Sequence, residues 1–120
     1  ENDNKIEDMF VFSMIMANKH KYPKAYFDVF DILIGIPLIN NNENIDQICY
    51  DTGYNCLDEE TKKIAIIYLK EAVYKGNLEA SNHVVNYYNK DLKSKIEEIY
   101  TDKLLNEKAL NNLKLASSKE

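Results

Sequence analysis

Apolar and polar residues follow a helical period in five segments of the chain, which short polar stretches separate. The five segments are 6–18, 23–34, 59–75, 78–89 and 91–115. Within each segment, apolar residues recur three and four positions apart. The whole chain of 120 residues contains only three glycines and two prolines. Because an all-β chain needs many more turn residues, we predict an all-α fold.

The first two segments are predicted to form a helical hairpin. Segment 6–18 is apolar on nearly every side, so we expect this helix to be well buried. Segment 23–34 begins at Pro23, which suits the first turn of a helix. Gly35 and Pro37 are expected to end it, because both disfavour a helix interior.

The third and fourth segments have clear start and stop signals. Asp58 is the expected N-cap of segment 59–75, and Gly76 is its expected C-terminal stop. Asn77 can cap the segment that follows, 78–89. We therefore predict a second hairpin with a tight turn.

Two pairs of alanines, each eight residues apart, mark the two hairpins: Ala17 and Ala25, then Ala72 and Ala80. The second pair follows the first at an offset of 55 residues, with no gap over the turn and the second helix. Small residues allow two antiparallel helices to approach closely where they cross. Lys21 stands where the second hairpin has Gly76, so we expect the two turns to differ.

The stretch "AIIYLKEAVYKGNLEASNHVVNYY", residues 65–88, resembles the Sel-one-like repeat, a relative of the tetratricopeptide repeat. The matching positions are Ala65, Tyr68, Leu69, Ala72, Gly76, Asn77, Ala80, Val84 and Tyr88. The family usually has leucine-glycine where Val84 and Val85 stand, which suggests looser packing against the next unit. The resemblance implies an α/α solenoid fragment that binds other proteins. The alternative is a generic helical hairpin with coincident alanines.

These features together predict one helical-repeat domain over residues 1–120. Residues 6–34 form a degenerate first hairpin, 35–57 an acidic loop with two cysteines, and 58–89 the Sel-one-like repeat. Two units are few for a solenoid, so we expect residues 91–115 to form a C-terminal capping helix or helix pair, with a break near Asn106.

Charge is uneven along the chain, whose net charge is -5. Residues 25–61 contain eight acidic residues and no basic one, and all fifteen cations of the chain are lysines. Such a segment attracts basic partners and repels phosphate, so we expect a protein partner and no nucleic acid. The alternative is a solvated acidic loop produced by a biased genome composition. The expected contact residues are Tyr50, Asp51, Tyr54, Asp58 and Glu59. A second expected surface, on the second helices of the hairpins, contains Asn82, Asn86 and Asp28.

Two cysteines, Cys49 and Cys56, lie seven residues apart in the acidic segment. They either form a disulfide that pins this loop or remain two unrelated thiols. A zinc site would need further ligands, and the two histidines match no zinc-binding spacing. We therefore expect no metal and no cofactor. His83 is expected to be a packing residue.

No motif in the sequence indicates catalysis, since there is no glycine-flanked nucleophile and no glycine-rich phosphate loop. We expect a non-catalytic protein-binding module. Its sharpest form is a small bacterial immunity protein that neutralises one basic toxin or effector. The alternative is an adaptor or scaffold fragment that binds a peptide or protein. The oligomeric state stays open.

The sequence leaves the location of the protein open. The chain begins "ENDNK" without a methionine, as a product of signal cleavage or a trimmed chain would. A disulfide favours a periplasmic or exported location over the cytoplasm. No apolar run is long enough to span a membrane.

Overall fold

The computed structural model describes residues 2–40, 57–88 and 102–118, and the side chains of 7–35, 57–86 and 102–118 among them. These residues form five helices: α1 (Asn2–Asn18), α2 (Pro23–Asn40), α4 (Glu59–Tyr74), α5 (Leu78–Tyr88) and α6 (Lys103–Ser118). The described residues contain no strand, so the predicted all-α class is confirmed for them. Within the same residues, no helix is long and apolar enough to cross a membrane.

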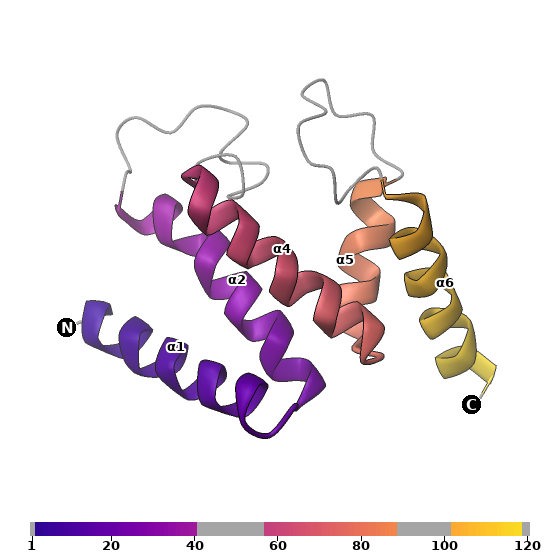
Figure 1. The fold of residues 1–120 in the computed structure, drawn as a ribbon, viewed down its shortest axis with the longest axis horizontal. Helices are drawn as coiled ribbons and strands as arrows, with labels where there is room; N and C mark the ends of the chain where they lie inside the picture. The colour runs from indigo at the N-terminus through magenta and orange to yellow at the C-terminus, as the bar shows by residue number, and fades with distance from the viewer. Residues whose placement is uncertain (1, 41–56, 89–101, 119–120) are drawn as a thin grey trace.

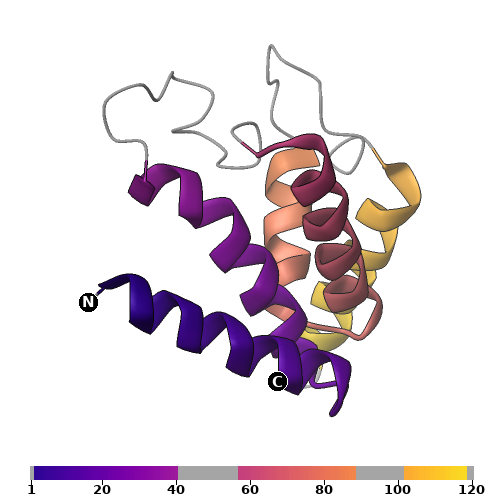
Figure 2. The same ribbon diagram turned by 60° about the vertical axis from the view of Figure 1, so that its left-hand side comes forward.

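The helices follow one another in space in the order of the chain, with α1 at one end and α6 at the other (Figure 1). Each helix packs on the next, and α4 also packs on α6. The most extensive contacts join α2 to α4 and α5 to α6. Helices α1 and α2 diverge from the turn that joins them, as the turned view also shows (Figure 2).

The core runs through all five helices and is made mainly of small and branched side chains. Its largest fully buried members are Phe30, Leu69, Leu105, Val29, Val73 and Val84. All four alanines that marked the two hairpins in the sequence are buried, with at most 3% of any side chain exposed. Their burial agrees with close approach of the paired helices, which leaves no space for a longer side chain.

The turns after α1 and α4 both contain a residue with left-handed backbone geometry. Gly76 has a φ of 89°, and Lys21, at the equivalent position, has a φ of 55°. The N–H of Asn77 donates to the Ala72 carbonyl, and that of Gly76 donates to the Val73 carbonyl. This is the Schellman pattern of a glycine-ended helix.

The turn after α1 is wider. There, the Tyr22 N–H donates to the Met16 carbonyl and the Lys21 N–H donates to the Ala17 carbonyl, so each bond spans one residue more than its counterpart. The two turns therefore differ, as expected, in how their hydrogen bonds close. Lys21 nevertheless adopts the same strained backbone region as Gly76, which costs a residue with a Cβ about 1 kcal/mol.

We expect Gly76→Ala to lower the free energy of unfolding by about 1 kcal/mol, because alanine disfavours left-handed geometry. A Cβ at Gly76 would meet no atom within 4 Å, so the cost is conformational rather than steric. The matched control is Gly35→Ala, where a Cβ also meets no atom within 4 Å. Gly35 lies inside α2, so this change is expected to stabilise by about 0.5–1 kcal/mol. Urea unfolding of both variants measures the two signs, and a stabilised Gly76→Ala variant would contradict the assignment of the turn.

Two predicted helix boundaries are wrong. Helix α2 continues through Gly35 and Pro37 to Asn40, although these residues were expected to end it near Ile34. A proline inside a helix removes one hydrogen bond and costs about 3 kcal/mol, a penalty that tertiary context can override. Helix α2 packs along α4, and such contacts supply the compensation.

The other boundaries agree more closely with the sequence. Helix α1 begins at Asn2, a turn earlier than expected. Helix α6 runs through Asn106 to Ser118 without the expected break, and Asn106 is buried. Residues 41–56 of the predicted acidic loop and 89–101 before α6 lie outside the described residues.

Candidate protein-binding face

Helix α1 exposes much of its apolar surface, which contradicts the expectation that it is well buried. The exposed fractions are 58% for Met9, 55% for Val11, 64% for Phe12 and 48% for Ile15. Only Ser13 and Ala17 are buried among the described side chains of this helix. The physical reason is position: α1 is the first helix of the row, so helices pack on one side of it only.

The same kind of exposure occurs on α4 and α6. Ile64, Ile67 and Tyr74 are exposed on α4, and Leu104, Leu110 and Leu115 on α6. Among the described side chains of α2 and α5, the only large apolar one that is exposed is Leu78, the first residue of α5. Exposed apolar side chains therefore concentrate on the first helix of each hairpin and on α6.

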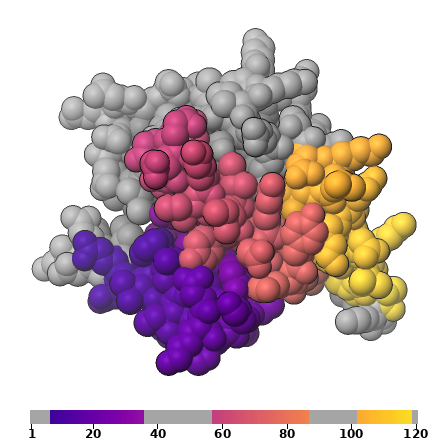
Figure 3. Space-filling model, viewed as in Figure 1, coloured from indigo at the N-terminus to yellow at the C-terminus, as the bar shows by residue number. Residues whose placement is uncertain are grey.

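Met9 and Phe12 on α1 are equivalent to Ile64 and Ile67 on α4 at the offset of 55 residues. The members of each pair are three residues apart, so they share one helix face. We call these four side chains the apolar face. Side chains of α1 and α4 meet on one side of the molecule in the space-filling view (Figure 3).

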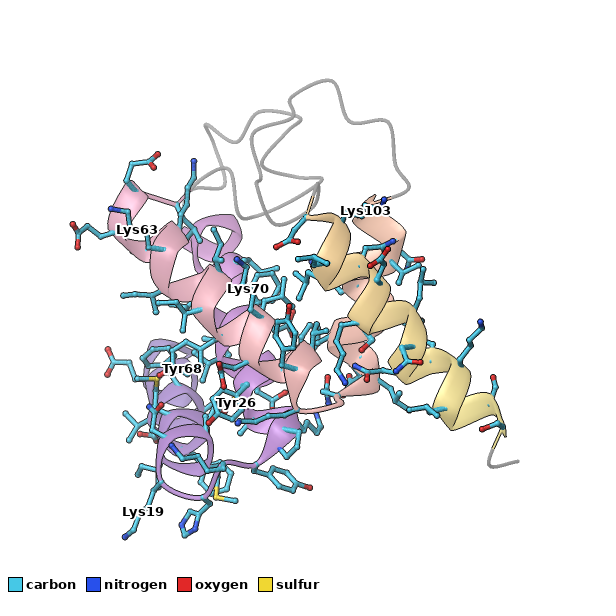
Figure 4. The ribbon with its side chains drawn as sticks, turned by 45° about the vertical axis from the view of Figure 1, so that its right-hand side comes forward. Lys19, Tyr26, Lys63, Tyr68, Lys70 and Lys103 are labelled. Atoms are coloured by element: carbon cyan, nitrogen blue, oxygen red, sulfur yellow. The ribbon has the colours of Figure 1, made fainter. Side chains whose placement is uncertain are left out.

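A polar contact fixes α1 and α4 relative to each other. The Asn18 amide nitrogen donates to the Tyr68 hydroxyl at 2.9 Å, and that hydroxyl is 3.1 Å from the amide oxygen, to which it can donate. The Tyr68 ring packs against Tyr26 of α2 with 5.9 Å between ring centroids (Figure 4). Lys75 Nζ lies 5.4 Å from the Tyr26 ring centroid, within the range of a cation–π contact. Helices α1, α2 and α4 are thereby joined beside the apolar face.

A group of charges lies where α2 meets α5. Lys24 Nζ is 3.1 Å from Asp28 and 3.4 Å from Glu79, so one lysine bridges two helices. The hydrogen bond from Asp28 raises the pKa of Lys24, and the other neighbours add to this. Partial burial, together with the nearby Asp28 and Glu79 carboxylates, raises the pKa of Asp31. Three carboxylates share one ammonium group here, so this surface has an excess of negative charge.

Two of the predicted contact residues lie at the start of α4 and have partners within the fold. Asp58 is the N-cap, as predicted, and its carboxylate accepts a hydrogen bond from the Thr61 N–H at 2.7 Å. This bond lowers the pKa of Asp58, because it favours the ionised form. Glu59 is 3.5 Å from Lys62 Nζ in an exposed ion pair. Asp58 therefore stabilises the helix start whether or not it also contacts a partner.

The predicted contacts on the second helices divide into two groups. Asn82 and Asn86 are exposed, and their spacing of four residues places them on one face of α5. His83 is half-buried, with its ring 5.1 Å from Phe30 and 6.1 Å from Phe27 in edge-on contacts. These contacts agree with its expected packing role. The other predicted residues, Tyr50, Asp51 and Tyr54 and the possible disulfide pair Cys49 and Cys56, lie outside the described residues.

Comparison of the chain with protein-family models, with curated protein sequences and with solved structures gave no match. The candidate site therefore depends on the contacts within this chain. In the part of the chain that the structure describes, no group of three or more histidine, cysteine, aspartate or glutamate side chains is arranged to hold a metal ion.

Sequence reasoning missed the apolar face. The apolar residues of segment 6–18 cover nearly every side of the helix, and such a pattern is typical of a buried helix. One available signal was the offset of 55 residues, which places Met9 and Phe12 on Ile64 and Ile67. Apolar residues at equivalent, non-alanine positions of two units would have indicated a shared surface.

Proposed function

We propose that this chain is a non-catalytic protein-binding module with a helical-repeat scaffold of the Sel-one-like type. The observation that carries the proposal is the concentration of exposed apolar side chains on α1, α4 and α6, while those of α2 and α5 are covered. Contiguous exposed apolar surface on a soluble domain marks an interaction site.

The apolar face suits a partner that inserts an apolar anchor. Phe12 is the most exposed member, and a phenylalanine loses little conformational entropy when a partner covers it. Aromatic residues at the centre of an interface contribute much of the binding energy. The contact between Asn18 and Tyr68 holds the two helices in place before binding, which reduces the ordering cost.

The sharper form of the proposal is a small immunity protein that neutralises a basic toxin. Its support is the excess of negative charge over residues 25–61 and around Asp28, Asp31 and Glu79. Charge of one sign steers a basic partner toward the surface and speeds association. The second candidate is an adaptor, which the apolar face favours because an adaptor can bind an apolar peptide without charge complementarity.

Affinity capture with paired variants tests the proposal and separates its two forms. The purified chain, immobilised, is exposed to lysate of its source organism, and bound proteins are quantified by mass spectrometry. We expect the combination of Phe12→Glu and Ile67→Glu to reduce capture of a specific partner at least tenfold, because it places carboxylates in an apolar contact. The matched control is Leu78→Glu, an exposed apolar residue on α5.

The combination of Asp58→Asn and Glu59→Gln tests the acidic surface. Asparagine caps a helix as well as aspartate does, so this variant keeps the helix start and removes two charges. Loss of a basic partner on this variant alone supports the immunity form. Loss on the apolar-face variant alone supports the adaptor. A partner that all three variants retain would contradict both.

A further inference from the structure

Helix α6 packs against the second hairpin as α4 packs against the first. Helix α4 makes extensive contacts with α2, the second helix of the preceding hairpin, and α6 makes similarly extensive contacts with α5. Helix α6 also packs on α4. This arrangement places α6 where the first helix of a third hairpin would lie.

One polar contact recurs at equivalent positions and defines the register. Tyr68 of α4 contacts Asn18, at the end of α1, and Tyr26 on α2. Asn112 of α6 donates to the Val73 carbonyl at 2.8 Å and to Ser81 Oγ at 3.0 Å. Val73 and Ser81 are the residues that follow Asn18 and Tyr26 at the offset of 55. Asn112 therefore occupies in α6 the position of Tyr68 in α4, at an offset of 44.

The helix caps and the sequence support the same register. Asp102 accepts a hydrogen bond from the Leu105 N–H as Asp58 does from the Thr61 N–H, and both equivalences have the offset of 44. At this offset four residues are identical between the helices: Ala65 and Ala109, Leu69 and Leu113, Lys70 and Lys114, Ala72 and Ala116. Helix α6 thus has the packing, cap and sequence of a first helix.

The two helices differ on one flank. In α4, which α5 covers, Leu69 and Val73 are fully buried and Ile66 is half-buried. The equivalent residues of α6 are less covered: Leu110 is 45% exposed, Leu113 is half-buried and Ser117 is exposed. Leu110, Leu113 and Ser117 lie on one face of the helix, which we call the open flank. Within the described residues no second helix covers it.

The open flank is complementary to itself. Glu107 and Lys114, on the rim beside Leu110, are seven residues or two helical turns apart. Both are exposed, and neither forms an ion pair within the described residues. When two copies of α6 lie antiparallel, Leu110 of one faces Leu113 of the other. The same register places Glu107 of each copy opposite Lys114 of the other.

We infer that α6 is the first helix of a third unit and that α6 of a second copy of the chain fills the place of its second helix. The dimer has a two-fold axis between the antiparallel helices, with leucines at the centre and two ion pairs at the rim. Ala109 and Ala116 beside the flank allow close approach, as alanines do in the two hairpins. The flank is separate from the apolar face, so dimerisation does not depend on the proposed function.

Sedimentation equilibrium of the full chain tests the dimer. One helix pair buries less than the roughly 1,200 Å² of a standard interface, so we expect a dissociation constant in the micromolar range. The apparent mass should rise with concentration from 14.0 kDa toward twice that value. Leu110→Glu should weaken the dimer at least tenfold. The matched control, Leu104→Glu, is 72% exposed on another face of α6 and should have no effect.

Charge reversal tests the register. Glu107→Lys and Lys114→Glu should each weaken the dimer about threefold, because each creates like-charge pairs. The double variant restores opposite charges and should dimerise as the wild type does. Thermal unfolding of each variant at low concentration verifies that the monomer remains folded. A chain that is monomeric at every concentration overturns the inference. A dimer that survives Leu110→Glu, or one that Leu104→Glu disrupts equally, does so too.

Discussion

Leu69→Ala is expected to lower the free energy of unfolding by about 3–5 kcal/mol, among the largest effects of any single substitution in this chain. Leu69 is fully buried at the middle of α4, the helix that packs on α2, α5 and α6. Its truncation removes apolar burial and leaves a cavity that three neighbouring helices cannot close together. A domain of this size has a stability of about 5–15 kcal/mol, so the loss is a large fraction of the total.

The control for this prediction lies two residues away. Ile67 is 59% exposed on the same helix, and Ile67→Ala removes a side chain of similar size. We expect it to change the unfolding free energy by less than about 0.5 kcal/mol. Urea unfolding followed by circular dichroism measures both. Equal effects of the two substitutions would contradict the described orientation of α4.

Ala72→Leu is expected to destabilise the fold by about 3 kcal/mol, at the upper end of overpacking effects. Ala72 is fully buried, and so is Ala80 of α5, with which it forms the alanine pair of this hairpin. Three additional carbon atoms at this position must displace α5 or adopt an unfavourable rotamer. The displacement would also strain the Schellman turn, because the Ala72 carbonyl accepts the hydrogen bond from Asn77.

Ala116→Leu is the matched control, because Ala116 occupies the equivalent position of α6 at the offset of 44. Ala116 is only half-buried, so we expect Ala116→Leu to change stability by less than about 0.5 kcal/mol at concentrations where the chain is monomeric. The difference between the two substitutions measures how much of the space beside each first helix is occupied. A strongly destabilised Ala116→Leu variant would show that the side of α6 is already covered.

The local features of the second hairpin were predictable because they depend on neighbouring residues. Asp58 accepts a hydrogen bond three residues along the chain, and the backbone of Gly76 adopts a geometry that glycine alone enters without cost. Asn77 caps α5 through a 2.8 Å bond from the Ala80 N–H. Each of these interactions closes within one helical turn, so residue type and spacing are enough to predict it.

The candidate site was less predictable, because two of its properties depend on helices distant in the chain. The exposure of Met9 and Phe12 follows from the position of α1 at the end of the row. Asp58 was predicted both as a cap and as a partner contact, and the structure provides a physical reason for the first of these. Tyr68 was singled out by a family resemblance, whereas its actual partners, Asn18 and Tyr26, became apparent only when the helices were placed.

The sequence by itself determined where helices form in the second hairpin, how they start and stop, and which alanines are buried. Helical period, capping and small-residue spacing act over a few residues, so they can be read without knowing the fold. Tertiary structure decided which apolar side chains remain exposed, because burial depends on how many helices surround each one. It also decided that α2 continues through Pro37, since packing along α4 offsets a local penalty. The same reason separates α6 from α4: their sequences are alike, but only α4 has a helix on each side.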